Sequence, residues 1–138
     1  NVIQGDANFD LEDYPDNSFS TVILSQTIQA MIYPERVIEN LIRIGNRAII
    51  SFPNFGYWKV RGDFLFSGRM PKNKILPYEW FNTPNIHLCS YKDFYDFCNL
   101  KKIKIENFFS LNEEGDVISN YFLINLFTYQ VIFCVSKQ

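Results

Sequence analysis

Two apolar runs separated by a helical segment constrain the fold of this chain more than any other feature. The runs are 19–24 and 48–52, and both are rich in β-branched residues, as expected of strands buried on both faces. Between them, apolar residues repeat at helical spacing over 37–42, after Pro34 and Glu35, which suit the first turn of a helix. The order strand, helix, strand predicts an α/β fold with parallel strands.

The residues around these elements predict where the chain turns and where further elements begin. Gly45 follows the helix, and we expect a left-handed residue there that ends it. Ser90 and Asp93 have the spacing of a capping box and predict a helix that ends near Leu100. Further strands are expected at 2–4, 102–106 and 127–135, the last one antiparallel. The predicted sheet is therefore mostly parallel.

A long connection, 51–89, joins the second apolar run to the capped helix. It contains both tryptophans and the only histidine of the chain. Connections of this length in compact domains are uncommon and usually functional, and the many aromatic residues argue against disorder. We expect a short amphipathic helix that carries Trp58 and Arg61, either as a lid over a cleft or as a surface that docks a partner. The alternative is that these aromatics simply close the core.

Composition and charge restrict the classes of function. The chain has 138 residues, of which 47% are hydrophobic and 20% are charged, as is typical of one globular domain. A net charge of −2 argues against binding nucleic acid through phosphate neutralisation. Segment 1–20 carries five acids and no base, whereas 59–74 carries five bases and one acid. These are two solvated faces, or else the basic segment meets an anionic substrate or an acidic partner.

The cysteines and the apolar C-terminal stretch argue against a metal centre and a membrane span. Cys89, Cys98 and Cys134 lack the spacing of a zinc or redox site. Three free thiols are expected of a cytoplasmic protein. The apolar stretch 121–135 is too short to span a bilayer and is interrupted by Asn125. We therefore expect it to form part of the core.

Two sets of motifs resemble known families. Gly-Asp-Ala at 5–7, a strand followed by Ser-Gln-Thr, and a helix that opens with Pro-Glu-Arg resemble the middle of a class I S-adenosylmethionine-dependent methyltransferase. Segments 43–56, 68–71 and 83–89 closely resemble the methionine biosynthesis protein MetW family. The second resemblance is the more specific one, and it covers roughly 1–111.

The MetW resemblance implies a Rossmann-like class I methyltransferase fold and a function in methionine biosynthesis. It implies an accessory, activating subunit of a homoserine O-acyltransferase; the alternative is a methyltransferase that acts on a small metabolite. For the cofactor S-adenosylmethionine, the resemblance places adenine at Asp6 and the amide of Ala7. Ser25 and Gln26 would line the cofactor cleft. From the residues alone, Asp6 is also compatible with a plain Asx turn.

Residues of the long connection are the candidates for a lid or a partner contact: Trp58, Arg61, Arg69 and His87. Tryptophan and arginine are enriched at interface hot spots. A lone histidine between apolar neighbours is more often structural than catalytic, and no Ser/His/Asp set or carboxylate pair is convincing. The sequence therefore predicts no catalytic residue, and whether the protein is an enzyme stays open.

The glycine-rich motif of dinucleotide and nucleotide sites is missing from this sequence. We expect residues 1–138 to form a single methyltransferase-like domain that is incomplete at its N-terminus. It would lack the first two βα units, roughly 60 residues at about 30 each. The cofactor would then bind weakly or not at all. Direct, stable pairing of 2–4 with 21–24 would contradict this hypothesis.

Overall fold

The computed structural model describes residues 4–119 and 122–138, which form one four-stranded sheet with helices. The strands are β1 (Val22–Ser25), β2 (Ala48–Pro53), β3 (Ile103–Leu111) and β4 (Gln130–Lys137). The helices are α1 (Pro34–Ile44), α2 (Trp58–Ser67), α3 (Tyr91–Leu100) and α4 (Ile124–Phe127), and the 3-10 turns are η1 (Asp10–Asp13) and η2 (Ile28–Ala30).

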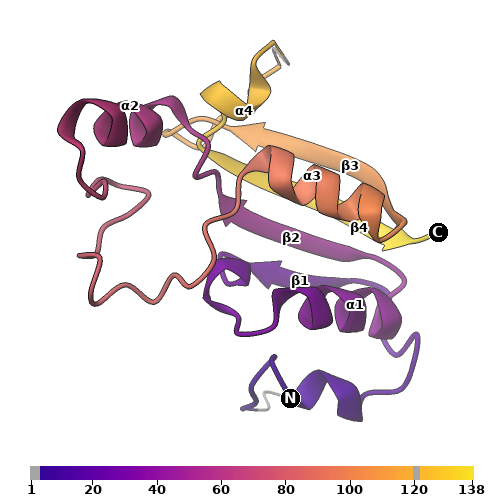
Figure 1. Cartoon of the computed structure of the whole chain (residues 1–138). Helices are drawn as coiled ribbons and strands as arrows, with labels where there is room; N and C mark the ends of the chain where they lie inside the picture. The colour runs from indigo at the N-terminus through magenta and orange to yellow at the C-terminus, as the bar shows by residue number, and fades with distance from the viewer. Residues whose placement is uncertain (1–3, 120–121) are drawn as a thin grey trace.

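The strands lie in the order β1-β2-β4-β3, so the last strand of the chain is inside the sheet (Figure 1). β1 and β2 are parallel, whereas β4 is antiparallel to both β2 and β3. The predicted antiparallel last strand is confirmed, but the prediction of a mostly parallel sheet is wrong. Although β1, β2 and β3 run in the same direction, β4 separates β2 from β3 and makes two antiparallel pairings there.

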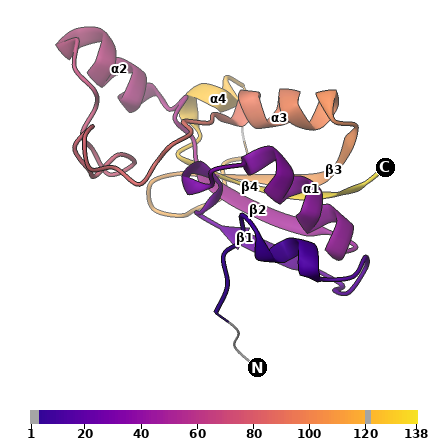
Figure 2. The ribbon, with the colours of Figure 1, turned by 60° about the horizontal axis from the view of Figure 1, so that its bottom comes forward.

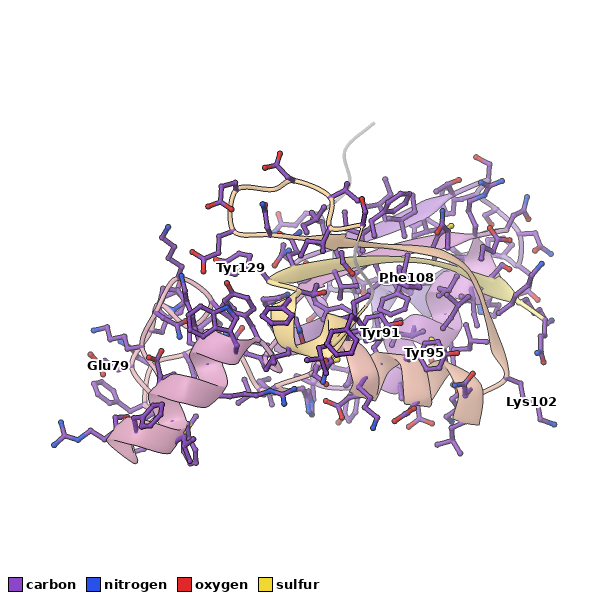
Figure 3. All side chains as sticks on the ribbon, turned by 90° about the horizontal axis from the view of Figure 1, so that it is seen from above. Glu79, Tyr91, Tyr95, Lys102, Phe108 and Tyr129 are labelled. Carbon is purple, nitrogen blue, oxygen red and sulfur yellow. The ribbon has the colours of Figure 1, made fainter. Side chains whose placement is uncertain are left out.

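One face of the sheet carries the main hydrophobic core, and α1 and α3 both cover this face (Figure 2). Leu24, Ile50 and Phe133 pair across β1, β2 and β4, and Phe108 of β3 continues the row. Ile50 and Phe133 are fully buried. Figure 3 shows Tyr91 of α3 beside Phe108, with ring centroids 5.3 Å apart, and Tyr91 also stacks on Phe133 at 5.5 Å.

The opposite face of the sheet is apolar, but neither α1 nor α3 covers it (Figure 2). Ile23 and Phe109 are 67% and 45% exposed, and Ile49 and Ile132 are half-buried. The expectation of burial on both faces is therefore wrong for β1, whereas β2 is buried along most of its length, with Ser51 buried on this face. In most α/β proteins helices protect both faces, whereas here apolar side chains of one face, such as Ile23 and Phe109, reach solvent.

Gly45 ends α1 as predicted, but not in the left-handed conformation. Its φ is −113°, which any residue can adopt. A Cβ atom at this position would lie 2.5 Å from Cγ2 of Val22 and 3.0 Å from the carbonyl oxygen of Arg47. Glycine is required here because β1 packs directly against the end of the helix. The residues next to Gly45 in the sequence give no indication of that contact.

The boundaries of the remaining elements agree with the sequence in part. The strand predicted at 102–106 extends to Leu111. The strand predicted at 127–135 begins only at Gln130, because α4 occupies the chain up to Phe127. Most of the strand predicted at 2–4 lies outside the described residues, and Gln4 belongs to no strand. Its pairing with 21–24 is therefore not tested.

The capping box predicted for α3 is confirmed. Oγ of Ser90 accepts a hydrogen bond from the amide of Asp93 at 3.3 Å, and the carboxylate of Asp93 accepts one from the amide of Ser90 at 2.9 Å. These bonds satisfy backbone donors that the helix itself leaves without partners. The start of α3 is thereby fixed immediately after the long connection.

The side chain of Asn54, which directly follows β2, joins three distant segments. Its Nδ2 donates to the carbonyl oxygens of Asn125 at 3.0 Å and Thr128 at 2.8 Å. Its Oδ1 accepts from the amides of Gly56 at 3.1 Å and Tyr91 at 3.0 Å. The residue is fully buried, and these bonds use its whole hydrogen-bonding capacity. Asn54 therefore positions the starts of α2 and α3 and the approach to β4.

We expect Asn54→Asp to lower the free energy of unfolding by about 3 kcal/mol or more, because two buried carbonyl oxygens lose their donors and face a carboxylate. Urea denaturation followed by circular dichroism measures this change. The control is Asn46→Asp at an exposed position, for which we expect a change below about 0.5 kcal/mol. Equal effects of the two substitutions would contradict the role of Asn54.

We expect Ser90→Ala to cost about 1 kcal/mol of stability, because the amide of Asp93 loses its capping acceptor. The same denaturation experiment measures it. Ser20→Ala, at an exposed position outside the helices and strands, serves as the control and should have little effect. A loss in Ser90→Ala no larger than that of the control would show that the cap contributes little.

Candidate functional site

Asp6, the predicted adenine ligand, lies in an exposed turn before η1. Its Oδ1 accepts hydrogen bonds from the backbone amide and the side-chain amide of Asn8, both at 2.9 Å. The backbone bond makes this an Asx turn, one of the two interpretations that the sequence allows. Oδ1 of Asn8 accepts from the amide of Ile32 at 2.9 Å, so the turn is attached to the chain between η2 and α1.

A hollow of about 400 Å³ opens beside this turn, and both Asp6 and Ala7 line it. Asp10 and Asp13 also line it, so three carboxylates and no basic side chain face the hollow. Such acceptors suit the exocyclic amine of adenine, whereas they would repel the carboxylate of S-adenosylmethionine. The hollow therefore offers acceptors for the adenine amine but no cation for the carboxylate of the cofactor.

Ser25 and Gln26 lie where β1 ends. Oγ of Ser25 is 3.3 Å from Oγ of Ser51, at the same end of the neighbouring strand. Gln26 has a left-handed φ of 52°, and its amide donates to the carbonyl oxygen of Ser51 at 2.9 Å. Left-handed conformations in residues other than glycine are uncommon and recur at functional sites. Both side chains are exposed, but neither lines the hollow beside Asp6.

The long connection forms α2 where the sequence predicts a short helix, but the helix is not amphipathic. Val60 is buried, whereas Trp58, Leu65 and Phe66 on other sides of the helix are exposed. Figure 1 shows α2 and the chain that follows it extending beyond the end of the sheet. The alternative that the aromatics of this helix close the core fails for Trp58, Phe64 and Phe66, which are all exposed. The neighbouring Tyr57 is buried.

Large apolar side chains are exposed along the rest of this segment. Their exposed fractions range from 48% to 88%, and we use the name 64–88 surface for this set of residues, which are neighbours along the chain: Phe64, Leu65, Phe66, Met70, Tyr78, Trp80, Phe81, Ile86 and Leu88. Concentrations of exposed apolar residues on soluble domains mark binding sites for proteins or other ligands.

Three of the four candidates for a lid or a partner contact lie on or next to α2. Trp58 is half-exposed at its first turn, and Nε of Arg61 donates to the carbonyl oxygen of Gly56 at 2.5 Å. Arg69 is exposed and follows Gly68, which ends α2 in the left-handed conformation. Arg61 therefore stabilises the start of α2, while Trp58 and Arg69 are accessible.

His87 lies apart from the other three candidates. Its amide donates to the carbonyl oxygen of Gln29 at 3.0 Å. With Cys89 and Phe94 it lines a groove of about 290 Å³ that also involves residues of α1 and α3. The structure therefore places His87 beside η2, in a different site from the basic and aromatic residues of α2.

The basic segment 59–74 is partly neutralised within the protein. Nζ of Lys59 lies 2.5 Å from Oε1 of Glu113, and Lys72 forms an ion pair with Glu79. Arg61, Arg69 and Lys74 form no ion pair with another described residue. The positive charge that faces outward is therefore smaller than the sequence indicates.

Tyr57, Lys59 and Glu113 form one hydrogen-bonded group between α2 and the turn that follows β3. The hydroxyl of Tyr57 donates to Oε1 of Glu113 at 2.8 Å. The bond from Lys59, and next the bond from Tyr57, hold the pKa of Glu113 below its usual value. The pKa of Tyr57 is raised, chiefly by burial, and the pKa of Lys59 is raised by its bond to Glu113. The ion pair is therefore complete at neutral pH.

The thiols are poor candidates for nucleophiles. Burial raises the pKa of both Cys89 and Cys98 to about 12, so both are protonated at neutral pH. Within the described ranges, no three histidine, cysteine or acidic residues are placed to hold a metal ion. Among the helices of the described residues, none has the length and apolar character needed to cross a membrane.

Two residues that organise this region have no clear signal in the sequence. Asn54 bonds to Thr128, which is 74 positions away, and Glu113 bonds to Tyr57, which is 56 positions away. Glu113 occurs in a sequence typical of a turn, and nothing local indicates its partner. For Asn54, the available signal is its place in the MetW-like motif directly after Pro53, at the end of a predicted strand.

Comparison with known sequences identifies the family. The sequence model of the family described as "Methionine biosynthesis protein MetW" matches residues 1–135. The bifunctional methionine biosynthesis protein MetXA/MetW of Rhodopirellula baltica is 35% identical over 106 residues, which are 76% of this chain. The chain spans 17% of the length of that relative.

Solved structures show the same fold at low sequence identity. A SAM-dependent methyltransferase of Thermotoga maritima, described as a possible histamine N-methyltransferase, matches 99% of this chain and 63% of its own with a TM-score of 0.66 and 18% identity. A SAM-dependent methyltransferase of Archaeoglobus fulgidus matches 99% of this chain and 67% of its own with a TM-score of 0.55 and 17% identity. The fold is methyltransferase-like, and by its family match the chain belongs to the MetW family of methionine biosynthesis proteins.

Proposed function

We propose that the protein is an accessory subunit that binds and activates a homoserine O-acyltransferase in methionine biosynthesis. Membership of the MetW family supports the pathway. The Rhodopirellula baltica relative, whose name joins MetXA and MetW in one bifunctional protein, supports a physical association of two such components. The partner in this proposal is a MetX-type homoserine O-acyltransferase, as the family resemblance implies.

The observation that carries the proposal is the 64–88 surface. Phe66 and Trp80 are 88% and 74% exposed. Keeping such large apolar side chains in water costs an isolated domain free energy that a bound partner would recover by burying them. Aromatic residues of this kind dominate binding energy when a partner buries them. The surface extends beyond the end of the sheet, and a second protein can approach it without displacing the core (Figure 1).

We expect the protein to stimulate acyl-homoserine formation by the MetX-type enzyme of the same organism. Trp80→Ala and Trp58→Ala should each weaken the complex by more than about 1 kcal/mol, because each removes an aromatic anchor. Calorimetric titration measures the affinity, and the acylation rate with and without the protein measures activation. The side chains of Trp58 and Trp80 are 47% and 74% exposed, so their removal should leave the fold intact.

Leu100→Ala is the matched control, because Leu100 is 78% exposed but lies at the end of α3, outside the 64–88 surface. The Leu100→Ala variant should bind the MetX-type enzyme as tightly as the unchanged protein does. Binding that is unaffected by Trp80→Ala would remove the 64–88 surface from the proposal, and binding unaffected by Trp58→Ala would remove the first turn of α2 from it. Absence of both binding and stimulation would remove the accessory function itself.

The second candidate function is S-adenosylmethionine-dependent methyl transfer to a small metabolite. The methyltransferase-like fold and the carboxylates beside Asp6 favour it. Methyl transfer needs chiefly the positioning of donor and acceptor, so the lack of an identified catalytic base does not argue against it. In this candidate function, Asp6 and Ala7 contact adenine, and Ser25 and Gln26 lie along the cleft.

We expect residues 1–138 alone to bind S-adenosylmethionine no more tightly than a dissociation constant of about 1 mM, because the hollow at Asp6 suits only part of the cofactor. Isothermal titration measures this constant. Micromolar binding that is lost in Asp6→Ala but kept in Asp116→Ala, at an exposed turn, would instead favour the methyltransferase.

A further inference from the structure

A second hollow, of about 340 Å³, lies at the base of α2, and we call it the Tyr57 pocket. Its lining residues come from the start of α2 and the residue before it, from the chain after α2, from the turn that follows β3 and from the residue before β4: Tyr57, Lys59, Asn73, Lys74, Ile75, Glu113 and Tyr129. The volume is at the lower end of the roughly 300–1,000 Å³ that is usual for small-molecule sites. Figure 3 shows Tyr129 at the beginning of β4, on the side where α2 lies.

The apolar part of the pocket is made by two aromatic rings and one aliphatic side chain. Tyr57 and Ile75 are buried, and they belong to the second hydrophobic cluster of the protein. The ring of Tyr129 meets that of Tyr57 edge-on, with centroids 5.7 Å apart. Buried, mutually packed walls of this kind are rigid enough to hold an aliphatic chain in one orientation.

Three charged groups line the same pocket. Among the described residues, hydrogen bonds to the carboxylate of Glu113 are made at Oε1, from Tyr57 and Lys59, which leaves Oε2 able to accept another donor. Lys74 forms no ion pair with a described residue, and its charge is close enough to act on Glu113. The pocket therefore presents one available carboxylate oxygen and two ammonium groups around an apolar floor.

We infer that the Tyr57 pocket binds a small zwitterion, an α-amino acid with an aliphatic side chain. Its carboxylate pairs with Lys74 and Lys59, its ammonium donates to Oε2 of Glu113, and its side chain packs on Ile75 and the tyrosine rings. A simple carboxylate would bring a second negative charge close to Glu113 with no ammonium group of its own to offset the repulsion. This inference goes beyond the proposed function, because the binding needs neither the acyltransferase nor S-adenosylmethionine.

The test is a titration with L-norleucine and with the two molecules that lack one of its charged groups, hexanoate and pentylamine. Trp58 reports binding by fluorescence, because its ring lies 5.9 Å from that of Tyr57 and 5.5 Å from Nζ of Lys59. The exposed Trp80 is first changed by Trp80→Phe, so that Trp58 is the single tryptophan. L-norleucine should bind at least about tenfold more tightly than either fragment.

Two variants connect the signal to the pocket. Lys74→Gln should weaken the binding of L-norleucine at least about tenfold, because the carboxylate loses one of its cations. Lys92→Gln, an exposed lysine of α3, should leave it unchanged. Circular dichroism establishes that both variants fold. Binding of hexanoate as tight as that of L-norleucine, no response to L-norleucine, or equal affinity in the two lysine variants would each overturn the inference.

Discussion

The saturated hydrogen bonding of the Asn54 amide is the constraint on which the functional end of this protein depends. One buried side chain stands where β2 ends and makes two bonds to the chain before β4 and two to the starts of α2 and α3. Burying a polar group costs free energy unless its donors and acceptors find partners. The long connection can therefore leave and re-enter the domain at one defined place, although its middle part extends into solvent.

The sequence predicts those parts of the fold that depend on neighbouring residues. The helix from Pro34, the strand from Ala48 and the capping box at Ser90 each follow from residues within one or two turns of the chain. The sheet pairing could not be derived in this way, because the position of β4 between β2 and β3 is a long-range property. Gly45 shows the same limit, because glycine is required there by the close approach of the Val22 side chain, which lies 23 positions earlier in the sequence.

In the candidate site, too, the features that depend on neighbouring residues could be predicted, and the long-range contacts could not. The motifs that resemble the MetW and methyltransferase families point to the Asp6 turn, the end of β1 and the aromatic connection. In the structure these are an Asx turn, a contact between Ser25 and Ser51, and the helix α2. It does not bring them into one cleft, and it assigns His87 to a separate groove. The partners of Tyr57 and Lys59 could not be predicted, because Glu113 is distant in sequence and looks like an ordinary turn residue.

The internal position of β4 has a consequence for the way the chain reaches its fold. β2 and β3 have no bonds to one another and are joined only through residues 130–137, which follow the other three described strands along the chain. Until that strand has left the ribosome, both partners have unpaired edges that can associate with other chains. The sheet therefore closes in one late step, and we expect slow folding and a tendency of nascent chains to aggregate before it.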